Sequence, residues 1–135
     1  MQDTDFTQLF VYGTLMRGEP NHRLMCRAEF VRQTTTAPTY ELIHLGSYPA
    51  LIPGGQTGVA GEVYRVDPRT LRALDRLEGH PHLYCRMRLR LFDGEVVEGY
   101  LMQPRQVVGW PRIATGTWRT RRNKEVHGAD QNRGR

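Results

Sequence analysis

The sequence predicts a β-rich α+β fold, built on a curved antiparallel sheet or a small barrel. Three observations favour it. Short runs of β-forming residues recur along the chain, 14 glycines and 8 prolines lie between them, and a single segment has the spacing of a clear amphipathic helix. A chain of 135 residues can bury one core without disulfides. We therefore expect one globular domain.

Six segments have the composition of strands, each bounded by turn residues. They cover residues 8–12, 27–33, 40–43, 58–66, 85–92 and 96–102. Several alternate apolar and polar residues, as strands with one solvated face do. The Asp93-Gly94 pair between the last two predicts a hairpin.

The first strand ends abruptly at Gly13, and a tight turn is expected there. Gly13 can take the positive φ that other residues resist. The turn of Tyr12, Gly13, Thr14 and Leu15 leads toward a short helix over residues 21–26, with Asn21 as its N-cap. Successive backbone N–H groups in such a turn can form an anion-binding nest.

The clearest local pattern is a helix that starts after Asp67. Asp67 can cap it, Pro68 suits its first position, and Gly79 followed by Pro81 ends it. Its apolar stripe consists of Leu71, Leu74 and Leu77.

Glu78 falls on the side of this helix that carries the leucine stripe, in the last turn. Burial and the negative end of the helix dipole both raise a carboxyl pKa, which suits an acid that transfers protons. The alternative interpretation is a structural ion pair between Glu78 and Arg86 or Arg88. Glu62 and Asp75 are weaker candidates, and Asp75 is expected to face solvent.

The formal charge of +5 is concentrated near the end of the chain, in residues 119–124. Residues 119–135 lack apolar periodicity, so we expect a domain over residues 1–118 followed by a basic, disordered tail. The tail can serve solubility or contact nucleic acid or phospholipid. No aromatic residue is interleaved with its charges to stack on bases, which makes nucleic acid the less favoured partner.

The rest of the composition indicates a cytoplasmic protein. The first five residues carry acids where a secretory signal carries cations, and no apolar run approaches the roughly 20 residues that span a bilayer. Cys26 and Cys85 form no C-x-x-C pair, so a disulfide framework is not indicated. His80, His82 and Cys85 are zinc-ligand types close together, but Pro81 separates the histidines and no carboxylate completes a familiar spacing.

Four segments in this order resemble the gamma-glutamylcyclotransferase-like superfamily, and most closely gamma-glutamylamine cyclotransferase and its small bacterial relatives. They are residues 10–22 (FVYGTLMRGEPNH), 48–50 (YPA), 61–64 (GEVY) and 74–86 (LDRLEGHPHLYCR). The resemblance extends from about Leu9 to about Met102. It implies a compact mixed β-barrel with short flanking helices. It also implies a cavity that accepts a gamma-glutamyl group and releases it as 5-oxoproline and a free amine.

The resemblance also implies the roles of the site residues. The turn of Tyr12, Gly13, Thr14 and Leu15 holds the substrate through its main chain, and Glu78 is the catalytic acid and base. No metal or organic cofactor is implied.

Tyr48 and Tyr84 are expected at the pocket wall. Tyr12 and Tyr84 can bind substrate, or pack in the core with satisfied hydroxyls. A second hypothesis is a non-catalytic module that binds a small carboxylate in the same pocket. The identity of the amine and the oligomeric state stay open.

Overall fold

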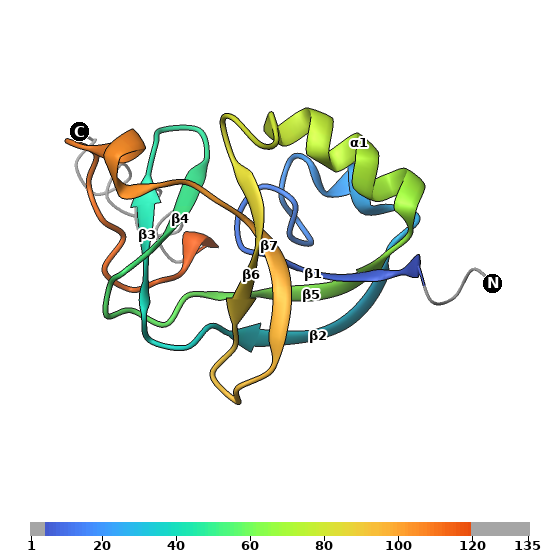
Figure 1. Ribbon diagram of the computed structural model, residues 1–135, viewed down its shortest axis with the longest axis horizontal. Coiled ribbons are helices and arrows are strands. Elements are labelled where there is room, and N and C mark those ends of the chain that lie inside the picture. The colour runs from blue at the N-terminus through green and yellow to red at the C-terminus, as the bar shows by residue number, and fades with distance from the viewer. Residues whose placement is uncertain (1–4, 120–135) are drawn as a thin grey trace, which may run out of the picture.

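The computed structural model describes residues 5–119. Within them the chain forms seven strands, one α-helix and two 3₁₀ helices (Figure 1). In chain order these are β1 (Thr7–Val11), η2 (His22–Met25), β2 (Glu29–Thr35), β3 (Tyr40–His44), β4 (Pro49–Pro53), β5 (Ala60–Val66), α1 (Pro68–Glu78), β6 (Cys85–Arg90), β7 (Val96–Leu101) and η3 (Pro104–Val107).

The strands form one mixed sheet in the order β2-β5-β1-β7-β4-β3, and β6 pairs with β7. Strand β1 is antiparallel to β5, whereas β7 runs parallel to both β1 and β4. The α+β class and the mixed sheet implied by the family resemblance are therefore confirmed, whereas the antiparallel sheet favoured by the strand patterns alone holds only for part of the pairs. The sheet also does not close into a complete barrel, because β2 and β6 approach each other only through an isolated Thr36–Leu91 bridge.

All six predicted strand segments are strands, and β4 is the one that was not predicted. Prolines stand at both of its ends, Pro49 and Pro53. A proline lacks a backbone donor, so it is tolerated only at strand ends or edges, and the short segment between the two has the appearance of a loop. Four of the five residues of β4 are buried.

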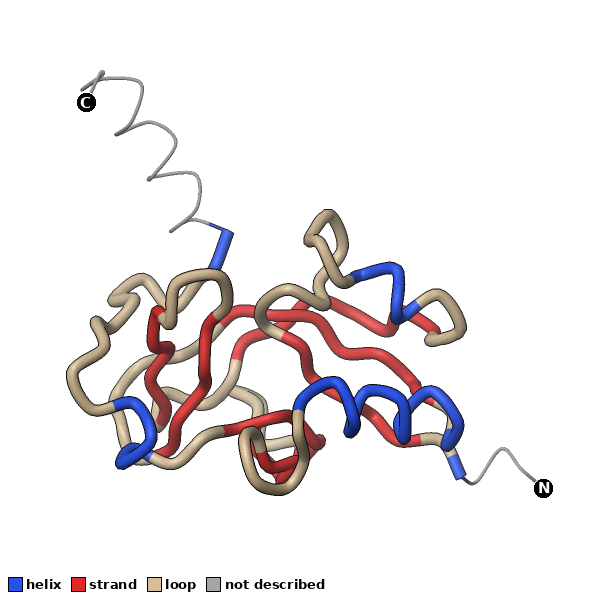
Figure 2. The backbone as a smooth tube through the Cα atoms, turned by 90° about the horizontal axis from the view of Figure 1, so that it is seen from above, coloured by secondary structure: helices blue, strands red, loops and turns tan. Residues whose placement is uncertain are grey.

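Helix α1 matches its prediction in detail. The Asp67 side chain accepts a hydrogen bond from the Thr70 backbone N–H at 2.7 Å, and Gly79 ends the helix at φ +68°. Leu71 and Leu74 are buried, but Leu77 is 46% exposed. Figures 1 and 2 show α1 to one side of the sheet, with its C-terminal end leading into the loop before β6.

The core gathers on the central strands. Leu9 and Phe10 of β1, Leu51 of β4 and Val63 of β5 are completely buried. Because β1 is held between β5 and β7, the chain leaves the sheet at a fixed position after Val11. The rigid end of β1 thus positions the turn that follows it.

Most of the predicted basic tail, residues 120–135, lies outside the described residues. Arg119 is described, and its guanidinium lies 3.6 Å from Glu19 and 3.7 Å from Glu62. No helix in residues 5–119 is long and apolar enough to cross a membrane.

Candidate active site

A cavity of about 410 Å³ opens where β1, β4, β7 and the end of α1 meet. Glu78 and the whole Tyr12–Leu15 turn line it, although they are more than 60 residues apart in the sequence. The lining residues are Phe10, Val11, Tyr12, Gly13, Thr14, Leu15, Pro20, Asn21, Ser47, Tyr48, Pro49, Leu77, Glu78, Leu83, Tyr84 and Tyr100. All seven predicted site residues are therefore on one cavity.

The turn after β1 presents free donors to this cavity. The Met16 backbone N–H donates to the Gly13 carbonyl at 3.1 Å, which closes a tight turn. Within residues 5–119 the backbone N–H groups of Gly13, Thr14 and Leu15 donate to no acceptor. Donors arranged in this way can bind a carboxylate or a developing oxyanion.

Asn21 and His22 hold the turn from outside. Asn21 donates its backbone N–H to the Thr14 carbonyl at 2.9 Å and its side-chain Nδ2 to the Thr14 hydroxyl at 3.0 Å. His22 Nδ1 lies 2.9 Å from the Leu15 carbonyl oxygen. Asn21 occupies the N-cap position of η2 as predicted, but its side chain makes no capping bond, because it is engaged by Thr14.

Gly13 is required for a reason that the sequence did not reveal. It does not use the positive φ that is open to glycine. Instead, a Cβ atom at Gly13 would lie 2.6 Å from Pro49 Cγ, which is closer than real Cβ contacts allow. The glycine therefore permits the turn to pack directly against the first residue of β4.

Glu78 is the last residue of α1 and is partly buried beside the cavity. Burial raises the pKa of its carboxyl to about 7. The alternative interpretation, an ion pair with Arg86 or Arg88, is not found. Among the described residues no ion pair or hydrogen bond engages the Glu78 carboxyl.

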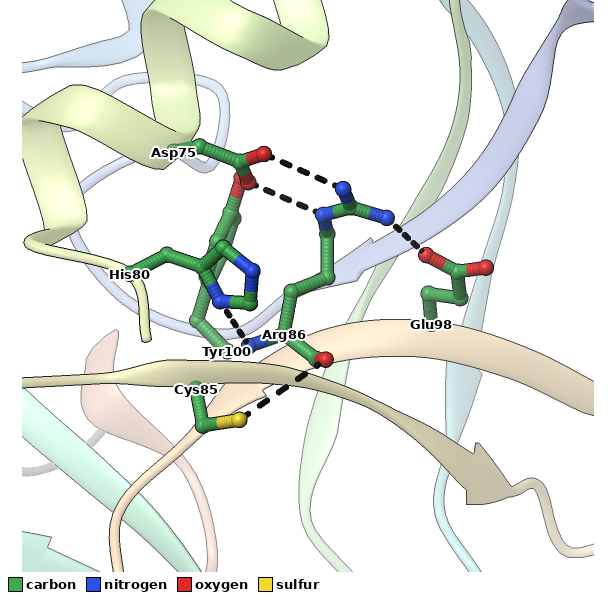
Figure 3. A network of polar contacts seen from close by, with 6 residues as sticks. All are labelled: Asp75, His80, Cys85, Arg86, Glu98 and Tyr100. Carbon is green, nitrogen blue, oxygen red and sulfur yellow. Dashed lines mark hydrogen bonds and ion pairs between the residues drawn. The ribbon is translucent and has the colours of Figure 1, made fainter. Parts of the chain in front are cut away.

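Asp75 does not face solvent freely, contrary to our expectation. Both of its carboxylate oxygens accept hydrogen bonds from Arg86, and the Tyr100 hydroxyl donates to Oδ1 at 2.6 Å (Figure 3). Arg86 also donates to Glu98. The ion pair suggested for Arg86 is thus made with Asp75, one turn before Glu78.

The buried tyrosines form the floor and wall of the cavity. The Tyr12 hydroxyl donates to the Tyr100 carbonyl at 2.6 Å and accepts from the Leu51 backbone N–H at 3.2 Å. The Tyr84 hydroxyl donates to the Pro49 carbonyl at 2.7 Å. Burial raises the pKa of both phenols, so they are neutral donors.

Tyr48 differs from these two tyrosines, because it stands at the cavity mouth and is 42% exposed. Glu62, the other weaker acid candidate, lies outside this cavity.

The hypothetical zinc ligands do not come together. Residues 5–119 contain no group of three or more His, Cys, Asp or Glu side chains that could hold a metal ion. His80 Nδ1 accepts a hydrogen bond from the Arg86 backbone N–H at 2.9 Å, so this ring holds the loop after α1 against the start of β6.

Tyr100, Leu77 and Leu83 line the cavity, and sequence reasoning did not place them there. Tyr100 belongs to β7, whose alternation did not show which face it presents. Leu77 was assigned to the core because of its helical spacing. Only the position of the cavity at the end of α1 distinguishes it from Leu71 and Leu74.

A family model described as "Gamma-glutamyl cyclotransferase, AIG2-like" matches residues 9–120, which include every residue of the cavity. This chain belongs to that family. The match confirms the resemblance inferred from the four sequence segments.

The similarity of the chain to named proteins of the gamma-glutamyl cyclotransferase family supports this assignment. Over 92 residues the chain is 45% identical to a human protein named gamma-glutamylaminecyclotransferase. This alignment covers 62% of the chain and 60% of the human protein. It is 36% identical over 111 residues to the family protein YtfP of Escherichia coli, with 82% and 95% covered.

A solved structure of an AIG2-like protein from Mus musculus matches with TM-score 0.70 and 30% identity over 84% of this chain and 88% of that one. The match spans 55–62% of the length of the curated mammalian relatives.

Proposed function

We propose that this protein is a gamma-glutamyl cyclotransferase, which converts a gamma-glutamyl amine or a related gamma-glutamyl compound into 5-oxoproline and a free amine. One observation carries the proposal. An unpaired carboxyl with a pKa near 7, Glu78, lines the same cavity as the unbonded N–H groups of the Gly13–Leu15 turn. Membership of the family supports the same reaction.

The reaction is an intramolecular acyl transfer. The substrate's α-ammonium loses a proton, its nitrogen attacks the γ-carbonyl carbon, and the carbonyl oxygen gains negative charge. The tetrahedral intermediate then breaks its bond to the original amide nitrogen, and this nitrogen takes up a proton as the amine leaves. Glu78 as carboxylate accepts the first proton and returns it to the leaving amine, so one group serves both transfers.

The turn supplies the electrostatic part of catalysis. The N–H groups of Gly13, Thr14 and Leu15 are donors for the substrate's α-carboxylate or, in another arrangement, for the developing oxyanion. Because the attack is intramolecular, holding the gamma-glutamyl chain in its folded shape supplies much of the acceleration. The rings of Tyr12 and Tyr84 shape the space in which the chain folds.

The amine side of the substrate faces the cavity mouth. Tyr48, Leu77 and Leu83 line it and are each more than 40% exposed. Apart from Glu78, none of the lining residues carries a charged side chain. We propose that this apolar rim contacts the carbon chain of the leaving amine.

The test is release of 5-oxoproline from a panel of gamma-glutamyl amines and gamma-glutamyl peptides. We expect Glu78→Gln to lower kcat by 10²–10⁴-fold with an unchanged fold, because general acid–base catalysis contributes on this order. Glu29→Gln is the matched control, since Glu29 is exposed on β2 and does not line the cavity.

Undiminished turnover in Glu78→Gln would refute the role of Glu78. Tight binding of gamma-glutamyl compounds by the wild-type protein without turnover would favour the binding module instead.

A further inference from the structure

The guanidinium of Arg86 forms ion pairs with two carboxylates. Its Nε and Nη2 atoms donate to the two oxygens of Asp75 at 2.9 and 3.0 Å, and Nη1 donates to Glu98 at 2.5 Å. Figure 3 shows the guanidinium between the two carboxylates. The bidentate pair with Asp75 fixes the direction of the side chain as well as its charge.

Asp75 and Glu78 are neighbours on α1. Residues three apart on a helix have Cβ atoms about 5–6 Å from each other, so the two carboxyl groups start from neighbouring positions on the helix surface. It binds Asp75, whereas Glu78 has no cationic partner within residues 5–119. Neither Asp75 nor Arg86 lines the cavity.

Tyr100 supports the pairing of Arg86 with Asp75. Tyr100 lines the cavity together with Glu78, and its hydroxyl donates to Asp75 Oδ1 at 2.6 Å. Burial and the bond to Asp75 raise the pKa of the Tyr100 phenol, so it remains a donor. Burial alone would raise the pKa of Asp75, but the bonds from Arg86 and Tyr100 outweigh it and lower that pKa, so Asp75 remains an anion.

We infer that Asp75 is a positioning residue for the site: it retains Arg86 outside the cavity and thereby keeps the Glu78 carboxyl free of a cation. A cation beside Glu78 would stabilise the carboxylate and make it a weaker base. The catalytic consequence rests on the proposed function, whereas the arrangement of charges does not.

Burial is the cause of the raised pKa of Glu78, and no charged group among residues 5–119 adds to it. The phenols that face Glu78 come from three separate segments of the chain, and the burial of each raises its pKa. They belong to Tyr12, Tyr84 and Tyr100, with Tyr48 at the mouth. Beyond them lie Asp75, Arg86 and Glu98, and the loop after α1 carries His80 and His82.

The decisive experiment is an NMR titration of Glu78, with ¹³C-labelled glutamate carboxyls and Glu78→Gln to assign the signal. In the wild type we expect Glu78 to titrate near pH 7. In Asp75→Asn, Arg86 keeps only Glu98 as an anionic partner and can turn to Glu78. We expect the Glu78 pKa to fall by about one unit, the lower end of the effect of a nearby opposite charge.

Three further variants separate this mechanism from a general loss of charge. Glu98→Gln also removes one carboxylate partner of Arg86, but it leaves the ion pair with Asp75. The shift of the Glu78 pKa in this variant is therefore expected to be less than half as large as in Asp75→Asn. Arg86→Gln removes the cation and should not lower the Glu78 pKa. The double variant Asp75→Asn/Arg86→Gln should restore a value near that of the wild type.

An unchanged Glu78 pKa in folded Asp75→Asn would overturn the inference, and so would an equal shift in Glu98→Gln. If Asp75→Asn does not fold, the double variant and Arg86→Gln test the inference instead. A lowered Glu78 pKa in either of these variants contradicts the inference. The acidic limb of kcat/KM should shift with the titration. Absence of turnover in the wild type would refute the proposed function and leave the NMR result decisive for Asp75.

Discussion

The carboxylate of Glu62, which is 1% exposed, accepts a hydrogen bond from the backbone N–H of Arg17 at 3.0 Å. The Tyr64 hydroxyl donates to the same oxygen at 2.9 Å, and the guanidinium groups of Arg17 and Arg119 lie 3.5 and 3.7 Å from the other oxygen. Glu62 thus anchors the chain immediately after the proposed substrate-binding turn, from the side that is not part of the cavity.

Replacing Glu62 with alanine should therefore loosen the turn. We expect the free energy of unfolding to fall by about 2–3 kcal/mol, because the variant leaves the Arg17 N–H and the Tyr64 hydroxyl without their acceptor. The measurement is urea denaturation. Glu29→Ala is the control, because Glu29 is an exposed acid on β2, the strand that pairs with β5. A loss below about 0.5 kcal/mol would show that Glu62 does not anchor the turn.

The contact of Gly13 with Pro49 predicts a severe effect of a single methyl group. In Gly13→Ala the new Cβ must displace either the turn or the start of β4. We expect kcat/KM to fall by at least tenfold, because the N–H donors of the turn move relative to Glu78. Gly94→Ala is the comparison, since Gly94 has nothing within 4 Å but adopts φ +92°, and its cost should appear in stability instead of activity.

The raised pKa of Glu78 makes stability depend on pH. The folded protein holds this proton up to about pH 7, whereas an unfolded chain releases it near pH 4.5. Stability from this group is present below pH 4.5 and is lost as the pH rises through 7. Glu78→Gln should therefore gain stability over the wild type between pH 5 and 8, by up to about 3 kcal/mol. Denaturation curves of both proteins at pH 5 and pH 8 measure this change. If the variant and the wild type differ in stability by the same amount at both pH values, the prediction is contradicted.

The apolar rim predicts a change in substrate binding. Truncation of Leu83, which is 48% exposed at the cavity mouth, removes apolar contact surface without touching Glu78. We expect Leu83→Ala to raise KM about three- to tenfold for gamma-glutamyl amines with an alkyl chain, from roughly 1 kcal/mol of lost contact, with kcat little changed. Val108→Ala is the control, because Val108 is more exposed but does not line the cavity.

The sequence was sufficient wherever a local rule determined the structure. Asp67, Pro68 and Gly79 delimit α1 through capping chemistry that involves only neighbouring residues, and Asp93-Gly94 forms its hairpin for the same reason. The helix period alone also placed Glu78 on the inward side of α1. The motif segments then identified the family, which no single periodicity could have done.

The remaining features depend on contacts between distant segments. Strand β4 was missed because its two prolines appear unsuitable for a strand until its neighbours β3 and β7 are known. The reason for Gly13 was not found from the sequence, because the approach of Pro49, 36 residues later, has no local signal. Asp75 was placed toward solvent because its helical position does not show that Arg86 and Tyr100 of the next strands reach it.

The two hydrogen bonds of the Tyr12 hydroxyl determine from which side ligands enter the cavity. The hydroxyl joins the Tyr100 carbonyl of β7 to the Leu51 amide of β4, so two strands and the turn after β1 are linked at one buried oxygen beneath the cavity. Amide hydrogen exchange at Leu51 should accordingly be among the slowest in the protein, since it requires separation of the sheet itself. Ligands therefore enter at the exposed rim, around Leu77 and Leu83, while the floor stays closed.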